Sequence, residues 1–229
     1  MGLAATYAIP GFHEPVSCFT HLLAAPVFAI WGIWLIRRGR GSVGRMLSLG
    51  VLVFSTVFLL SISGVYHLLG PGTARYVLKI LDIAGIFALI AGTATPVHYI
   101  LYRGKMRWLP LLAYWAVAAT GISLRSVFPE GLPLALGVGV FLAMGWAGVV
   151  TMFLMWRQFG YDFIRALLMG GAAYSVGAVL LLLDWPVVLP GVIGPHELWH
   201  VAVLGGLFWH WRFVSQLVEL QRINQEAIP

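Results

Sequence analysis

The chain has 229 residues, of which 60% are hydrophobic and 10% are charged, and its mean hydropathy is +0.91. Soluble domains usually carry about 25% charged residues, so this composition excludes an ordinary soluble domain and predicts an integral membrane protein. The single Cys18 excludes an internal disulfide and a zinc site built from several cysteines. The net charge of +6 suits the anionic headgroups of membrane lipids, and no basic helix indicates a nucleic-acid partner.

Seven apolar runs follow one another along the chain. Each approaches or exceeds the roughly 20 apolar residues that cross a hydrocarbon core of about 30 Å. Clusters of Gly, Pro and Arg separate the runs, and no polar linker divides the chain into two domains. We therefore expect one all-α membrane domain at 16–214, between a short tail at 1–15 and another at 215–229. The expected transmembrane helices cover residues 16–36, 46–69, 76–99, 108–124, 132–156, 166–183 and 196–214.

Basic residues are distributed unevenly over the two ends of this predicted bundle. The loops after the first, third and fifth spans share one side with the C-terminal tail, and this side carries eleven of the fourteen Lys and Arg residues. Only Arg75, Lys79 and Arg125 fall on the side of the N-terminal tail. The positive-inside rule therefore predicts an external N-terminus and a cytoplasmic C-terminus, and a bacterial inner membrane fits best.

Four ionisable side chains from distant parts of the sequence are predicted to share one membrane depth. His196 and His200 begin the last span four residues apart, so on a helix they lie on one face about 6 Å apart along the axis. His67 near the end of the second span and Asp82 near the start of the third lie on the same side of the membrane. Ionisable residues inside a membrane usually face the bundle interior with a partner, so we expect these four to converge.

The convergence predicts a metal site with His67, His196 and His200 as ligands. Three imidazoles leave one position open on a tetrahedral zinc ion, which is the ligand count of a catalytic site. Ser63 lies one helical turn before His67, and Asp82 is placed to orient a bound water or to accept its proton, because zinc lowers the pKa of water towards about 7. We assign Asp82 and Ser63 as catalytic residues. The alternative is that the histidines only pack and hydrogen-bond within the bundle.

Other polar residues near the span ends are assigned different roles. Glu197 points roughly 100° away from the histidine before it, so we expect a structural or loop contact. His98 and His210 lie far from the predicted metal site and are expected to be ordinary interior or interfacial residues. Glu14 and His21 stand two helical turns apart on the metal side. Two alternatives stay open for this pair: a contact between them, or a contact of Glu14 with the loops around the metal.

These residues also carry a resemblance to a known family. Its motifs stand in order as Glu14-Pro-Val-Ser17-Cys-Phe-Thr20-His21, then Ser63-Gly-Val-Tyr-His67 with Asp82, then His196-Glu-Leu-Trp-His200. Together with the run at 89–96, they resemble the bacterial haemolysin III branch of the progestin and adipoQ receptor (PAQR) family, within the CREST superfamily of membrane hydrolases. The resemblance covers nearly the whole chain. It implies a zinc ion held by the three histidines, with Asp82 and Ser63 around the bound water.

The resemblance also implies three alternative functions. The first is a zinc-dependent hydrolase of lipid amides, similar to a ceramidase, that contributes to membrane lipid and fluidity homeostasis. The second is a non-catalytic membrane sensor with a structural zinc ion. The third is a pore or cytolysin, which we place last because the polar residues gather at one depth, whereas a pore needs them at both. Animal relatives have the zinc on the cytosolic side, whereas the charge distribution of this chain places it outside.

Overall fold

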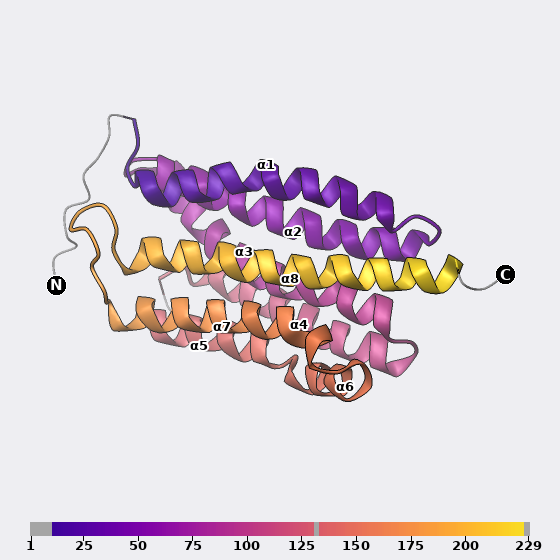
Figure 1. The fold of residues 1–229 in the computed structure, drawn as a ribbon. Coiled ribbons are helices and arrows are strands. Elements are labelled where there is room, and N and C mark those ends of the chain that lie inside the picture. The colour runs from indigo at the N-terminus through magenta and orange to yellow at the C-terminus, as the bar shows by residue number, and fades with distance from the viewer. Residues whose placement is uncertain (1–10, 131–132, 227–229) are drawn as a thin grey trace.

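The structure is a computed structural model that describes residues 11–130 and 133–226. These residues form a bundle of helices that run roughly along one axis, with the two ends of the chain at opposite ends of the bundle (Figure 1). The helices are α1 (Pro15–Arg38), α2 (Val43–Leu68), α3 (Thr73–Leu101), α4 (Lys105–Val127), α5 (Leu134–Trp146), α6 (Val149–Phe159), α7 (Tyr161–Leu183) and α8 (Pro195–Glu226).

Helices α5 and α6 are separated only by 147–148 and together make one candidate membrane span, Leu134–Phe159, so the eight helices of the described residues amount to seven segments. Within the part of the chain that the structure describes, five segments are long and apolar enough to cross a membrane, judged by length and composition alone: α1, α2, α3, the stretch Leu134–Phe159, and α7. The other two, α4 and α8, are 23 and 32 residues long but less apolar. Their lower hydropathy follows from the charged start of α4 and from the histidines and Arg212 of α8. The predicted all-α membrane bundle is confirmed.

The helices extend beyond the apolar runs that predicted them. α7 starts at Tyr161 and not at 166, because Asp162 and Arg165 form a charged first turn that hydropathy does not include. α8 continues past 214 to Glu226, and an ion pair of 2.7 Å between Arg38 and Glu219 ties this extension to the end of α1. The predicted start of the fifth span at 132 lies outside the described residues, as do 1–10 and 227–229.

Helix α8 lies inside the bundle, between the α1–α2 pair and α7 (Figure 1). Its residues Trp211, Phe213 and Leu217 are fully buried, and the indole nitrogen of Trp211 donates a hydrogen bond of 3.2 Å to Thr56 of α2. A buried indole N–H needs such a partner, since no water reaches it in the membrane. Because α8 is packed among the other helices, its first turn is held level with the end of α2 along the axis of the bundle.

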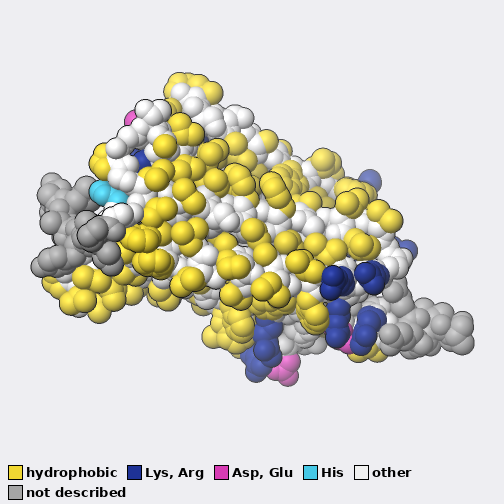
Figure 2. Space-filling view, turned by 90° about the horizontal axis from the view of Figure 1, so that it is seen from above, with side chains coloured by type: hydrophobic (Ala, Val, Ile, Leu, Met, Phe, Trp, Pro, Cys, Tyr) yellow, Lys and Arg dark blue, Asp and Glu magenta, His cyan; other side chains and the backbone are white. Residues whose placement is uncertain are grey.

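The outer surface of the bundle is apolar over most of its length (Figure 2). Large apolar side chains such as Leu23, Ile30 and Phe54 are exposed there, which suits contact with lipid tails. Most of the Lys and Arg side chains in this view lie toward the C-terminal end of the molecule (Figure 2). The opposite end holds the start of α1, the end of α2 and the start of α8, and it is the end that contains the predicted metal site (Figure 1).

Candidate metal centre

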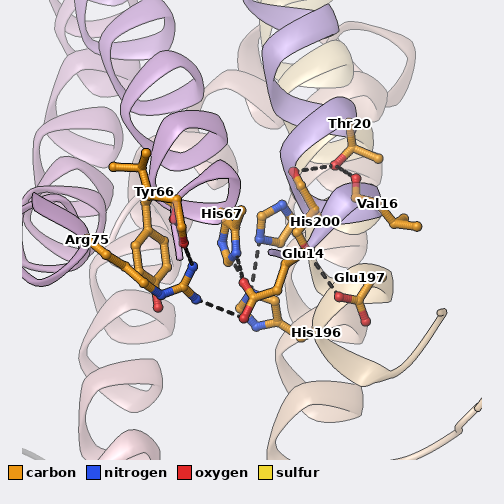
Figure 3. A network of polar contacts seen from close by, with 11 residues as sticks. Glu14, Val16, Thr20, Tyr66, His67, Arg75, His196, Glu197 and His200 are labelled. Atoms are coloured by element: carbon orange, nitrogen blue, oxygen red, sulfur yellow. Dashed lines mark hydrogen bonds and ion pairs between the residues drawn. The ribbon is translucent and has the colours of Figure 1, made fainter. Parts of the chain in front are cut away.

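Three imidazoles meet where the last turn of α2 faces the first turns of α8 (Figure 3). The Nε2 atom of His196 lies 3.4 Å from that of His67 and 3.2 Å from that of His200. One ring nitrogen from each histidine falls within 4.8 Å of the others. The helical spacing of four residues and the position of α8 beside α2 thus bring together the three histidines that the sequence singled out.

These separations fit a single small metal ion. Zinc binds imidazole nitrogen at about 2.0–2.1 Å in a tetrahedral arrangement, which places two ligand nitrogens roughly 3.3 Å apart. The two Nε2–Nε2 distances of 3.2 and 3.4 Å match that edge length. His67 and His200 are buried, while His196 is exposed at the rim. Of the three rings, His196 is therefore the one that reaches the surface of the bundle.

Ser63 and Asp82 lie beside this cluster. Ser63 is buried one turn before His67 on α2, and its side chain hydrogen-bonds with the carboxyl group of Asp82 on α3. Both residues line the same cavity as His196 and His200. The structure thus places the two side chains that were assigned as catalytic in the same cavity as two of the three imidazoles.

Glu14 contacts the metal-site residues and not His21, which settles the alternative left open by the sequence. One carboxylate oxygen contacts Nδ1 of His67, and the other lies 2.9 Å from Nη2 of Arg75 (Figure 3). Burial raises the pKa of Glu14, but the contacts with His67 and Arg75 outweigh that effect and lower it to about 2. Glu14 is therefore a carboxylate at neutral pH.

Two further contacts around the site were not predicted in detail. The ring of His21 stacks on the ring of His200, with centroids 4.0 Å apart, and neither of its nitrogens has a hydrogen-bond partner among the described residues. Glu197 accepts a hydrogen bond of 2.9 Å from the hydroxyl of Ser17 and another of 2.9 Å from the backbone N–H of Gly194. Glu197 thus makes the structural contact expected of it, and it joins the start of α8 to α1.

A cavity of about 220 Å³ extends from the imidazoles into the bundle. Its wall is mostly apolar, with residues from α3, α5, α6, α7 and α8, including Ile86, Leu142 and Val203. His98 and His210, predicted to be ordinary interior residues, also line it. The polar groups of the candidate site therefore open onto an apolar chamber inside the membrane domain.

Comparison with known proteins agrees with the motifs. A family model described as "Haemolysin-III related" matches residues 12–211. "Hemolysin-3" of Bacillus cereus is 30% identical over 197 residues, which cover 84% of this chain and 86% of that protein. "Hemolysin-3 homolog" of Bacillus subtilis (strain 168) is 29% identical over 197 residues, 84% of this chain and 88% of that protein. "Heptahelical transmembrane protein 4" of Arabidopsis thaliana is 30% identical over 177 residues, which cover 68% of this chain and 45% of that protein. The chain therefore belongs to the haemolysin-III-related family.

Proposed function

We propose that this protein is a zinc-dependent membrane hydrolase that cleaves amide bonds in lipids and thereby contributes to membrane lipid and fluidity homeostasis. One observation carries the proposal: three imidazole nitrogens lie at metal-binding separations, and two of the rings, His196 and His200, line a mostly apolar cavity together with Ser63 and Asp82. A hydrolase of lipids needs this combination of a polar reaction centre and an apolar chamber for an acyl chain.

His67, His196 and His200 would hold the zinc ion. Neutral imidazoles are ligands that zinc favours, and three of them leave one position for a water or substrate oxygen. When bound, zinc polarises an amide carbonyl and lowers the pKa of water. The metal group found among the described residues has three members, which supports a catalytic site over a closed structural one.

Asp82 would perform the proton transfers, and Ser63 would position its carboxyl group. Asp82 accepts the proton of the attacking water and delivers it to the nitrogen of the leaving amine, as a general base and then a general acid. Ser63 holds the Asp82 carboxyl group in orientation through their hydrogen bond. The apolar chamber excludes bulk water from the acyl chain, and it leaves the polar headgroup of the lipid at the exposed rim beside His196.

Two alternatives fit the observations less well. A sensor with a structural zinc ion would be favoured by a fourth protein ligand, whereas the metal group among the described residues contains three histidines. A pore would need a polar path, and although His98 and His210 bring polar groups to the far part of the cavity, most of its wall is apolar.

The proposed test is hydrolysis of fluorescent ceramides by protein purified in mild detergent. Wild-type protein is expected to release fatty acid in a reaction that a zinc chelator stops and added zinc restores. Asp82→Asn keeps the size of the side chain but removes its basicity, so it is expected to retain zinc and lose at least about 100-fold in rate. His98→Gln is the matched control, since His98 lines the cavity but lies outside the metal group.

Equal rates for wild-type protein and Asp82→Asn would contradict the role of Asp82. The absence of any lipid-amide hydrolysis by zinc-loaded wild-type protein, over a panel of acyl chain lengths, would contradict the hydrolase proposal.

A further inference from the structure

Glu14 meets the ring of His67 from the side opposite the metal-binding nitrogen. One carboxylate oxygen of Glu14 contacts Nδ1 of His67, while Nε2 of the same ring faces Nε2 of His196 at 3.4 Å (Figure 3). A carboxylate can only accept a hydrogen bond, so this contact requires a proton on Nδ1. With that proton in place, neutral His67 has its lone pair on Nε2, the nitrogen that faces His196.

Arg75 holds the Glu14 carboxylate in this position. Its Nη2 atom lies 2.9 Å from the second oxygen of Glu14, and its Nη1 atom donates to the backbone carbonyls of Tyr66 and Leu69 at the end of α2. The guanidinium group also lies over the ring of Tyr66, at 4.5 Å from the centroid. Arg75 is therefore anchored to the same helix end that carries His67, and the carboxylate between them has both oxygens engaged.

The backbone before α1 is attached to that helix end as well. The N–H of Glu14 donates to the carbonyl oxygen of His67 at 3.0 Å, and the N–H of His13 donates to that of Leu68 at 3.1 Å. The side chains of His67, Arg75 and Glu14 are 1%, 13% and 23% exposed. A partly buried carboxylate is costly without polar partners, and this one has an arginine on one oxygen and the N–H of an imidazole on the other.

We infer that Glu14 is the positioning residue of the metal centre: it fixes the tautomer and the direction of His67, and Arg75 fixes Glu14. Carboxylates that accept the second N–H of a metal-bound histidine orient the ring and raise its basicity, and their loss typically weakens metal binding by roughly 10–100-fold. This inference rests on the proposed zinc site. It makes the segment before α1, together with the first turn of α3, a part of that site.

Glu14 could serve the metal centre by positioning His67, or it could serve only the stability of the fold by neutralising Arg75. These two roles predict different results. We would measure the zinc dissociation constant by chelator competition, and the thermal midpoint of the zinc-free protein, for Glu14→Gln, Arg75→Gln and Glu130→Gln. Glu130 is the matched control because it pairs with Lys79 at 3.7 Å at the same end of the molecule and is 67% exposed.

Glu14→Gln is expected to weaken zinc binding by roughly 10–100-fold. Arg75→Gln is expected to weaken zinc binding less than Glu14→Gln does. Both substitutions break the same ion pair, so both are expected to lower the thermal midpoint of unfolding of the zinc-free protein. Glu130→Gln is expected to bind zinc as the wild type does. Unchanged zinc affinity in Glu14→Gln would overturn the inference, and so would equal losses of affinity in Glu14→Gln and Arg75→Gln.

The tautomer of His67 provides a readout that does not depend on zinc. In zinc-free protein labelled with ¹⁵N-histidine, His67 is expected to give the Nδ1–H signature in the wild type and to lose its preference for this tautomer in Glu14→Leu. An Nε2–H signature for His67 in the wild type would overturn the inference. Wild-type protein that shows the Nδ1–H signature but binds no zinc would instead contradict the proposed function and leave the Glu14–His67 contact standing.

Discussion

His67 contacts different partners on its two ring nitrogens. Its Nδ1 atom contacts Glu14, and its Nε2 atom lies 3.4 Å from Nε2 of His196, so both ring nitrogens have a partner. His200 is held differently, by the ring of His21 stacked at 4.0 Å. Since neither nitrogen of His21 has a hydrogen-bond partner among the described residues, the contribution of His21 to the site is its flat ring.

Substitutions of His21 are therefore expected to depend on ring shape. His21→Phe keeps a ring against His200 and is expected to leave zinc content unchanged, with a shift in unfolding free energy below about 1 kcal/mol. His21→Ala removes the ring and is expected to destabilise the protein by roughly 1–3 kcal/mol and to weaken zinc binding. Unfolding in mixed micelles and elemental analysis check both. Loss of zinc in His21→Phe would contradict this account, because it would make His21 a ligand.

The three metal-site histidines could be identified from the sequence because helical spacing and membrane depth both follow from the position of a residue along the chain. The i, i+4 relation of His196 and His200 and the alternation of the spans were enough to place His67 beside them. The partners of Glu14 could not be fixed in the same way, because its contact with Arg75 depends on how the segment before α1 folds over the end of α2. The link from Ser17 to Glu197 likewise depends on how α1 packs against α8.

At the scale of the helices, α1 and α2 approach closely where they support the site. A Cβ atom on Gly64 would lie 2.5 Å from a side-chain carbon of Leu22 and 3.1 Å from its backbone nitrogen. Small residues permit this close approach of two membrane helices. Gly64 stands between Ser63 and His67 on α2, so the same contact determines how far α2 stands from α1 at the depth of the metal centre.

Gly64→Ala is expected to destabilise the protein, by about 1–3 kcal/mol, because the backbone of α1 must move to make room. Gly50→Ala on the same helix is the control: its added Cβ meets nothing within 4 Å, and alanine favours the helix by up to about 1 kcal/mol. Denaturant unfolding in mixed micelles compares the two variants. A Gly64→Ala protein as stable as Gly50→Ala would show that α1 and α2 do not pack as described.

The break between α5 and α6 is a further feature of the fold that hydropathy did not predict. Residues 132–156 form one uninterrupted apolar run, so a window average treats them as one helix, whereas the helix ends at Trp146 and restarts at Val149. Gly145 lies just before the break and Gly148 lies in it, and glycine is a poor helix former, which is the local signal in the sequence. Both glycines line the cavity, so the interruption lies next to the chamber of the proposed substrate.

Most basic residues and the candidate metal centre lie at opposite ends of the molecule. The metal centre stands at the end where the N-terminal segment, the α2–α3 connection and the start of α8 meet, whereas most basic residues lie at the other end (Figures 1 and 2). By the positive-inside rule we propose that the metal centre faces the outside and that the basic end faces the cytoplasm, in a bacterial inner membrane.

Cysteine labelling in intact cells tests this orientation. The single native Cys18 is fully buried, so its background reaction with a membrane-impermeant maleimide is expected to be low. Glu130→Cys, at the metal-site end, is expected to label in cells whose inner membrane is intact. Arg103→Cys, at the basic end, is expected to label only after permeabilisation. The reverse pattern would place the metal centre on the cytoplasmic side.

The zinc site is tested most directly by the zinc content of the detergent-purified protein, measured by elemental analysis for the wild type and for His67→Ala, His200→Ala and Asp82→Ala. We expect close to one zinc ion per wild-type chain, loss of that zinc in both histidine variants, and its retention in Asp82→Ala, because the imidazoles and not the carboxylate would bind the ion. Carefully prepared wild-type protein that contains no zinc would contradict the zinc site and would leave these histidines a packing role.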